Sequence, residues 1–454
     1  MLYTEAARFL EKNSGSIKNI IYREYEQNKA LKADPRQVVG LVTSTLKYKK
    51  VLTDLIKLSG LLKQEKLLTR PVALLMVHDL LVSKSGRLNC GKCPQKDAIL
   101  RHKTRLKAEL VKYKIKHKVS SLESLAVHDQ TPVRWIRINQ LKTPNDKDVL
   151  DQLDLQFVDD VKDIGPGKIF PDVNVDHLYG IDPSFAITST DAYKKGQIII
   201  QDRASCFPAS ILAPKPGEKL IDCCSAPGNK TSHLAALVNG TPNSIVAFER
   251  DTRRAETLKK MMAVSGAHKA VEIKVQDFTT ANPQDYPEVT GLLVDPSCSG
   301  SGIFGRAYEE NDTESAVDDA RLHSLAGFQF KVVKHALSFP SARRVVYSTC
   351  SIHDEENEKV VRRLLEDEKV KAQGWKLRER HETLPRWTRR GKPSVFDGDE
   401  KLAQSCVRTI PIEDGGIGFF AVCFERSNGR AEKITNDHKE EGEEEEFEEW
   451  NGFT

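Results

Sequence analysis

One stretch of the sequence, residues 219–239, constrains the fold more than any other. A short apolar run ends in Asp222, the next loop contains Pro227 and Gly228, and an Ala/Leu-rich segment with helical periodicity follows. This order is typical of the first strand, loop and helix of a nucleotide-binding α/β sheet. Glycine lets the backbone approach a ligand, and the new helix offers unpaired N–H groups there. The stretch therefore predicts a ligand site in this loop.

A second apolar run, residues 244–249, indicates which ligand fits. It ends in Glu249, an acid placed to accept hydrogen bonds from a ribose. The spacing around Gly228 is not G-x-G-x-x-G, so the pyrophosphate of a dinucleotide fits poorly. A nucleoside without a pyrophosphate fits better, which favours S-adenosylmethionine. Taken alone, the loop suits an ordinary α/β turn without a ligand almost equally well.

Strands and helices continue to alternate after this point. The pattern predicts strands at residues 271–275, 291–295 and 344–351, helices at 251–265, 322–339 and 354–367, and a hairpin on the sheet edge at 405–410 and 418–424. Asp277 follows the third strand, where it could meet an adenine amino group. A helix within residues 201–214 is expected to cover the cofactor end of the sheet. Repeated βα units predict an α/β fold with a doubly wound, mostly parallel, Rossmann-like sheet.

The chain is expected to contain four parts. Residues 1–125 form a helical extension, with helices predicted at residues 2–12, 16–29, 35–59 and 71–83. Residues 126–200 form a small α/β module of the RRM-like kind, with strands predicted at residues 133–138, 156–161, 185–188 and 197–200 and a helix at 146–153. The catalytic core spans residues 201–427, and the highly charged residues 428–454 are expected to be disordered.

Charge is distributed unevenly along the chain. Residues 1–120 hold 26 Lys and Arg against 10 Asp and Glu, whereas residues 431–454 hold ten acids and two bases. Residues 101–118 are basic and interrupted by apolar side chains, which suits binding to a phosphate backbone. A solvated helix face explains that segment better when it is taken alone. The charge of the whole extension nevertheless favours contact with RNA.

Several features bear on the cellular compartment. The first 20 residues do not resemble a secretory signal, and no apolar stretch is long enough to span a membrane. Nine cysteines without a framework suit reduced thiols in the cytosol or nucleus. Cys90 and Cys93 have zinc-knuckle spacing, but no second pair follows, so an exposed turn without metal is expected. We therefore expect a soluble intracellular protein.

Two cysteines carry the chemical signal. Cys298 and Cys350 each lie at or just after the end of a predicted buried strand, and Asp295 precedes the first of them. Both should therefore lie at the carboxyl edge of the sheet, beside the cofactor loop. A thiolate is a strong nucleophile, although a free thiol needs a polar, electropositive site to ionise at neutral pH. One such cysteine would suit inert packing, but two at strand ends indicate catalysis.

Five motifs occur in order: Gln201-Asp-Arg-Ala-Ser, Asp222-Cys-Cys-Ser-Ala-Pro-Gly-Asn-Lys-Thr, Asp295-Pro-Ser-Cys-Ser-Gly-Ser-Gly, Tyr347-Ser-Thr-Cys-Ser and Glu355-Glu-Asn-Glu. Together they resemble the Sun-domain family of RNA cytosine-5 methyltransferases over roughly residues 131–425. The basic extension and the Pro-Ser-Cys sequence resemble the nucleolar subfamily that methylates large-subunit ribosomal RNA. The resemblance implies an S-adenosylmethionine-dependent methyltransferase core.

The resemblance also implies a role for each motif residue. Cys350 would be the nucleophile, Cys298 would assist release, and Asp295 would bind the cytosine edge. The residues implied to bind the cofactor are Cys224, Ser225, Ala226, Pro227, Gly228, Asn229, Lys230, Glu249, Arg254, Asp277 and Asp295. Two departures stand out: Asn229 replaces a usual glycine, and Pro-Ser-Cys replaces the commoner Ala-Pro-Cys. We expect the first to reshape the cofactor loop slightly and the second to affect the placement of Cys298.

The implied function is formation of 5-methylcytosine in RNA through a covalent cysteine adduct. The expected substrate is large-subunit ribosomal RNA or pre-ribosomes in the nucleolus of the nucleus, with the enzyme acting as a monomer. Transfer RNA is the alternative substrate. A catalytically silent RNA-binding ribosome-assembly factor is the alternative from another class, and the intact cysteines, Asp295 and cofactor loop argue against it.

Overall fold

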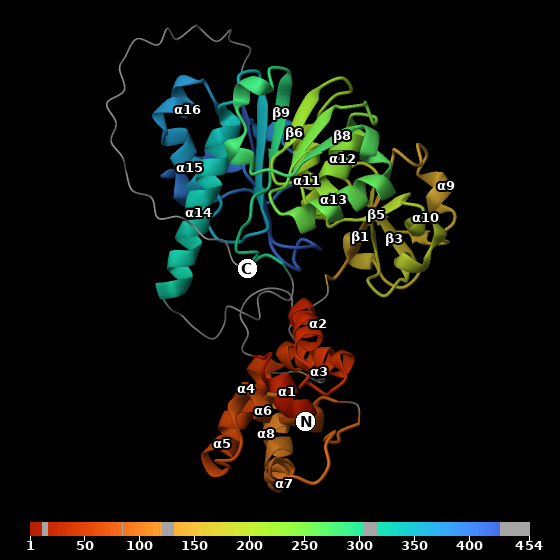
Figure 1. Ribbon diagram of the computed structural model, residues 1–454, viewed down its shortest axis with the longest axis vertical. Coiled ribbons are helices and arrows are strands. Elements are labelled where there is room, and N and C mark those ends of the chain that lie inside the picture. Colours follow the sequence, from red (N-terminus) through yellow and green to blue (C-terminus); the bar gives the residue numbers. More distant parts are fainter. Residues whose placement is uncertain (11–16, 84, 118, 120–130, 304–315, 427–454) are drawn as a thin grey trace.

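The protein contains a helical domain, a five-stranded sheet and an eight-stranded sheet (Figure 1). The structure, a computed structural model, describes residues 1–10, 17–83, 85–117, 119, 131–303 and 316–426. The predicted disorder of residues 428–454 concerns residues outside this described part. Among the described residues, no helix has both the length and the apolar character needed to cross a membrane.

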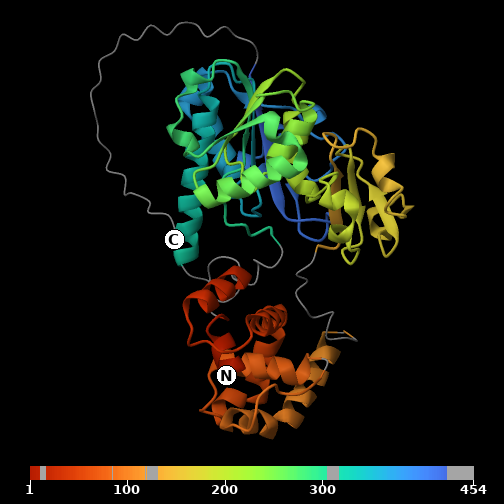
Figure 2. The same cartoon turned by 45° about the vertical axis from the view of Figure 1, so that its right-hand side comes forward.

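The described residues of the N-terminal domain form eight helices, which Figures 1 and 2 show as a separate group. They are α1 Leu2–Ala7, α2 Ile17–Gln27, α3 Pro35–Lys47, α4 Lys49–Ser59, α5 Leu61–Gln64, α6 Arg70–Leu81, α7 Pro94–Arg101 and α8 Lys103–Lys116. The predicted single helix over residues 35–59 is wrong, because the chain turns at Tyr48 between α3 and α4. The turn lets Val51 and Leu55 of α4 pack against Tyr113 of α8.

The five-stranded sheet has the order β2-β3-β4-β1-β5. Its strands are β1 Arg134–Ile138, β2 Gln156–Phe157, β3 Lys168–Pro171, β4 Leu178–Ile181 and β5 Ile198–Ile200, with helices α9 Lys147–Leu150 and α10 Asp191–Lys194 beside them. The predicted strand over residues 185–188 is wrong, since the 3₁₀ helix Ile187–Ser189 lies there. Strands β3 and β4 escaped prediction. Strand β4 was missed because it contains Gly180, and glycine is uncommon inside strands. Glycine is needed here, since a Cβ at this position would lie 2.8 Å from Val133.

The eight-stranded sheet confirms the predicted α/β fold. It has the order β11-β13-β10-β9-β6-β7-β8, and β12 pairs with β13. Its strands are β6 Lys219–Asp222, β7 Ile245–Phe248, β8 Val271–Lys274, β9 Val289–Val294, β10 Arg344–Thr349, β11 Lys376–Leu377, β12 Val407–Thr409 and β13 Phe419–Glu425. Five adjacent strands run parallel to one another, namely β8, β7, β6, β9 and β10 in the order of the sheet. The terminal hairpin is confirmed, but β13 is not an edge strand, because β11 pairs with its outer side.

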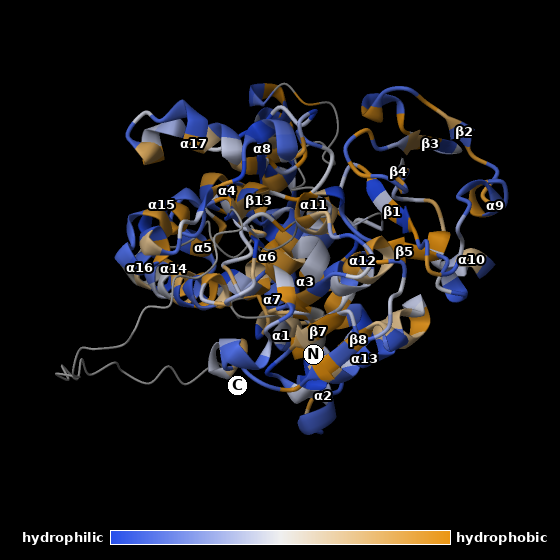
Figure 3. Cartoon of the chain, turned by 90° about the horizontal axis from the view of Figure 1, so that it is seen from above, coloured by the Kyte–Doolittle hydropathy of each residue, from blue (hydrophilic) through white to orange (hydrophobic). Residues whose placement is uncertain are grey.

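Helices cover both faces of this sheet (Figure 1). One face carries α11 Arg203–Leu212, α12 Asn229–Leu237 and α13 Thr252–Ser265, and the other carries α14 Ala316–Leu337, α15 Glu358–Glu366 and α16 Glu368–Ala372. Helix α17 Glu400–Ser405 precedes β12. Hydrophobic residues dominate α11 at the centre of the molecule, whereas the peripheral α16 is mostly hydrophilic (Figure 3).

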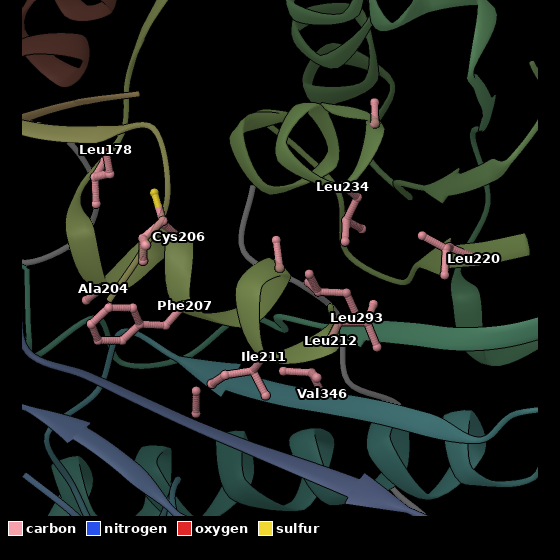
Figure 4. Packing of buried hydrophobic residues seen from close by; sticks show 14 of the residues in the cluster. Leu178, Ala204, Cys206, Phe207, Ile211, Leu212, Leu220, Leu234, Leu293 and Val346 are labelled. Atoms are coloured by element: carbon pink, nitrogen blue, oxygen red, sulfur yellow. The ribbon is translucent and has the colours of Figure 1, made fainter. Parts of the chain in front are cut away.

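Helix α11 packs across one face of the sheet, with Asp202 at its N-terminus near Lys230 of the cofactor loop, and the prediction that it covers the cofactor end of the sheet stays a prediction. Phe207, Ile211 and Leu212 lie against the face of the sheet near Val346 of β10 (Figure 4). These three side chains are buried in the core shared with β10 and β13. The sequence marks the helix but does not say which part of the sheet its apolar face contacts.

Candidate active site

The loops after β6, β7, β9 and β10 meet at the carboxyl edge of the sheet. A cavity of about 490 Å³ lies between them. Its walls contain nine of the predicted site residues, namely Cys224, Ala226, Pro227, Glu249, Arg254, Asp277, Asp295, Cys298 and Cys350. Ser225, Gly228, Asn229 and Lys230 belong to the same loop and helix but do not line this cavity.

The loop after β6 is held by hydrogen bonds at both ends. Thr231 Oγ1 donates to Asp222 Oδ2 at 2.7 Å, and burial raises the pKa of Asp222 to about 7. Ser225 N and Oγ both donate to the Phe248 carbonyl, at 2.9 and 2.8 Å. Ser225 therefore ties the loop to the end of β7, which explains its position outside the cavity.

Gly228 lies at the point where this loop enters α12. Its φ of +114° is a backbone conformation that side chains disfavour. A Cβ at this position would lie 3.0 Å from each of Leu258, Met261 and Met262 on α13. The loop thus passes close to α13, and only glycine fits there without displacing its neighbours.

Glu249 and Arg254 form the next wall of the cavity. The Glu249 side chain is buried and pairs with Arg254 Nη1 at 3.4 Å. Arg254 Nη2 also donates to the Ala226 carbonyl at 2.7 Å, so this side chain joins the loop after β6 to the end of β7. Asp277 follows the neighbouring strand β8, and its Oδ1 accepts hydrogen bonds from Thr279 N and Oγ1. Acceptor groups of this kind match the hydroxyl and amino groups of a nucleoside.

Asp295 lies at the centre of the site and accepts a hydrogen bond at each oxygen. Lys230 Nζ donates to Oδ2 at 2.7 Å, and Ser348 Oγ donates to Oδ1 at 2.6 Å. The sequence assigned Lys230 to the cofactor, whereas the structure places its ammonium group against Asp295 and near Cys350. Burial lowers the pKa of Lys230, but the charge and hydrogen bond of Asp295, together with the nearby Cys350 and Asp222, outweigh that effect, so the pKa is raised. These two contacts fix the orientation of the carboxylate.

Cys298 and Cys350 lie side by side. Their Sγ atoms are 3.1 Å apart, although the residues are 52 positions apart in sequence. The hydrogen bond with Cys350, together with burial, raises the pKa of Cys298 well above its usual value.

Sequence reasoning missed several residues around this cavity. Ser348 escaped notice, although it precedes Cys350 by two positions and therefore points to the same face of β10. Phe278 and Phe328 form apolar walls, and Gln276 and Thr279 add polar groups. No local signal marked these four residues, because their neighbours in space come from other strands.

Cys90 and Cys93 lie in the segment before α7, where their thiols are half-buried and in hydrogen-bond contact. Within the described ranges, no three His, Cys, Asp or Glu side chains cluster in a way that could hold a metal ion. The expectation of a turn without metal remains a prediction.

Comparison with known proteins identifies the family. The family described as 16S rRNA methyltransferase RsmB/F matches residues 209–425, and the N-terminal domain of NOL1/NOP2/Sun domain family member 5 matches residues 36–126. The 25S rRNA (cytosine-C(5))-methyltransferase rcm1 of Schizosaccharomyces pombe is 45% identical over 92% of this chain and 90% of its own. The chain belongs to the Sun-domain family of RNA cytosine-5 methyltransferases.

Further similarities agree with this Sun-domain membership. The 28S rRNA (cytosine-C(5))-methyltransferase of Mus musculus is 36% identical over 94% of this chain and 91% of its own. A solved methyltransferase homologue from Pyrococcus horikoshii shares the fold, with a TM-score of 0.53 and 21% identity over 82% of this chain and 99% of that chain. The resemblance read from the five sequence motifs is therefore confirmed.

Proposed function

We propose that this Sun-domain enzyme methylates carbon 5 of a cytosine in large-subunit ribosomal RNA. The proposal rests on the two thiols that lie 3.1 Å apart beside Asp295. One thiol is needed for attack on the cytosine ring, and the other is needed for release of the methylated RNA. The substrate follows from the relatives in S. pombe and mouse, which are named for 25S and 28S ribosomal RNA. We accordingly propose action in the nucleolus, on free RNA or pre-ribosomes, as a monomer.

The cavity supports S-adenosylmethionine as the methyl donor, because its acidic wall and the loop after β6 suit a nucleoside. Cys224, Ala226 and Pro227 would line the methionine and ribose end, with Glu249 at the ribose hydroxyls and Asp277 near the adenine. Arg254 holds that wall in place through Glu249 and Ala226. The cofactor supplies an electrophilic methyl group on a sulfonium. We assign no direct cofactor contact to Ser225, Gly228, Asn229 or Lys230, which lie outside the cavity wall. The first three shape the loop after β6 and the start of α12, and Lys230 orients Asp295.

Cytosine carbon 5 needs activation before it can accept a methyl group. The Cys350 thiolate would attack carbon 6, forming an S–C6 bond and moving the C5=C6 electrons to carbon 5. The neighbouring Lys230 ammonium favours a thiolate at Cys350, and the Cys298 thiol can donate its hydrogen bond to that thiolate. Asp295, held by Lys230 and Ser348, would bind the cytosine edge and stabilise charge pushed into the ring.

Release reverses the attack. After methyl transfer, carbon 5 carries both the methyl group and a proton. Removing that proton restores the C5=C6 bond and expels the Cys350 thiolate. Cys298 lies next to the S–C6 bond and would act as the base or position it. The target base must leave its stack to reach this site, so a single-stranded or flipped cytosine is required.

The activity is tested by incubating the purified protein with S-adenosylmethionine and unmethylated large-subunit ribosomal RNA or transfer RNA. Bisulfite sequencing should reveal 5-methylcytosine at one position of the ribosomal RNA. Methylation of transfer RNA alone would favour the alternative substrate. Methylation of neither RNA, free or in pre-ribosomes, would favour the silent assembly factor.

Cofactor binding provides a separate prediction. Glu249→Ala removes the buried acceptor, and Gly228→Val forces a side chain against α13. Each change should weaken S-adenosylmethionine binding at least about tenfold, since one charged hydrogen bond contributes roughly 1.5–3 kcal/mol. Calorimetry measures the affinity, and Glu256→Ala on the exposed side of α13 is the control with the same charge change. Equal affinities in Glu249→Ala and the control would remove Glu249 from the pocket.

The N-terminal extension is proposed to bind RNA by charge. Helix α8 buries Leu106 and Tyr113, while Lys103, Arg105 and Lys107 remain exposed. Neutralised phosphates release counterions, so RNA affinity should fall steeply as salt rises. Deleting residues 1–120 should weaken binding and flatten that dependence in filter-binding assays. Affinity that changes with neither salt nor the deletion would leave α8 as a solvated face.

A further inference from the structure

The Glu355-Glu-Asn-Glu motif contains two side chains that the proposed chemistry does not use. Glu356 and Asn357 are fully buried, they come directly before α15, and neither lines the cavity. Buried polar side chains are costly unless every group is paired. Their partners therefore indicate what this dipeptide does.

Glu356 holds the loop that carries Cys298. Its Oε1 accepts from Ser299 N at 2.8 Å, and its Oε2 accepts from Ser299 Oγ at 2.6 Å. Gln329 of α14 adds a second route, because its Nε2 donates both to Glu356 Oε1 at 2.9 Å and to the Ser297 carbonyl at 3.0 Å. The residues on both sides of Cys298 are thus fixed through one carboxylate.

Asn357 holds the loop that carries Cys350 in the same way. Its Oδ1 accepts from Thr349 Oγ1 at 2.5 Å, and its Nδ2 donates to the Ser351 carbonyl at 2.9 Å. The residues immediately before and after Cys350 are therefore both tied to one amide. Each of the two neighbouring side chains therefore holds one cysteine loop through hydrogen bonds, a set of contacts called its grip below.

The two loops also contact each other. Gly302 N donates to the Cys350 carbonyl at 2.9 Å, and the Ser301 and Ser351 hydroxyls lie 3.2 Å apart. Tyr347 donates a hydrogen bond to the Glu356 carbonyl, which anchors the dipeptide to β10. A movement of either loop would therefore change the separation of the two sulfur atoms.

We propose that Glu356 and Asn357 are positioning residues that set the geometry of the two cysteines, with Asn357 serving attack and Glu356 serving release. The assignment of steps rests on the proposed roles of Cys350 and Cys298. Displacement of a reacting group by about 1 Å can cost about a hundredfold in rate. Loss of either grip should therefore slow one step of the reaction without removing a reacting atom.

Asn357→Asp tests the first grip with almost no change in volume. It replaces the amide that donates to the Ser351 carbonyl with an oxygen that repels it. We expect covalent RNA adduct to form about tenfold to a hundredfold more slowly, with KM for RNA and S-adenosylmethionine affinity unchanged. Glu355→Gln, which alters a half-buried acid paired with Lys359, is the matched control and should behave as wild type.

Glu356→Ala tests the second grip. It should allow attack but slow release about tenfold or more, so that covalent RNA accumulates in denaturing gels. Glu356→Gln can still accept from Ser299 N and Gln329, and it should restore most of the release rate. If Glu356→Ala fails to fold, Ser299→Ala removes one contact of the same grip and should show a weaker accumulation.

Disulfide formation measures the geometry without RNA. With diamide as the oxidant, two thiols give one disulfide and the diazene is reduced to a hydrazine. We expect the Cys298–Cys350 disulfide, followed by mass spectrometry, to form about tenfold more slowly in Asn357→Asp and Glu356→Ala than in wild type and Glu355→Gln. Unchanged disulfide rates would overturn the positioning role. Slower disulfide formation without the predicted adduct pattern would keep that role and overturn the assignment of the cysteines.

Discussion

Cys350→Ala is expected to lower methylation by at least about 10⁴-fold and to abolish the covalent RNA adduct. Removal of a catalytic nucleophile produces losses of this size or larger, because the bond to carbon 6 can no longer form. Lys230 would still lie beside Asp295, and the cofactor cavity would keep its acidic wall, so binding of S-adenosylmethionine should be unchanged. Single-turnover assays and denaturing electrophoresis measure the two effects.

The control for this experiment is Cys93→Ala, which removes a partly exposed thiol outside the cavity. It should methylate at the wild-type rate. A Cys350→Ala protein that still forms a covalent band would show that Cys298 is the nucleophile. That assignment is chemically reasonable, because the two sulfur atoms lie 3.1 Å apart in the same cavity as Asp295.

Cys298→Ala is expected to attack and methylate once and then to stall. Without the second sulfur, the proton on carbon 5 would leave slowly, and the S–C6 bond to Cys350 would persist. RNA carrying one methyl group should therefore remain attached through denaturing electrophoresis, and multiple turnover should fall about 10²- to 10⁴-fold, the usual contribution of a general base. Labelled S-adenosylmethionine distinguishes a methylated adduct from an unmethylated one.

The double variant Cys298→Ala, Cys350→Ala provides the reference, since it should form no adduct at all. If Cys298→Ala releases RNA at the wild-type rate, the base lies elsewhere and Cys298 only shields or orients Cys350. The raised pKa of Cys298 would then matter solely because its thiol donates a hydrogen bond to the nucleophile.

Some parts of the site could be predicted because they are local in sequence. The apolar runs before Asp222, Asp295 and Cys350 each mark a strand, and the glycine at position 228 marks the start of a helix. In a parallel sheet these ends share one edge, so the grouping of Asp295, Cys298 and Cys350 followed from strand order alone. Ordered motifs then identified the family, and the basic charge of the extension favoured RNA.

Other features depended on contacts that no local pattern records. The pairing of the short strand β4 with β1 and the packing of α11 on the sheet face are fixed by neighbours far away in the chain. The same holds for the Lys230 and Ser348 contacts with Asp295, which join residues 65 and 53 positions apart.

The sequence by itself determined the fold class and the family and predicted the reacting residues, because periodicity and motif spacing are properties of neighbouring positions. Only the tertiary structure decided the 3.1 Å separation of the two sulfur atoms and the buried partners that maintain it. Strand register and helix packing bring Ser299 within reach of Glu356 across 57 positions, and such distances depend on the packing of the whole core.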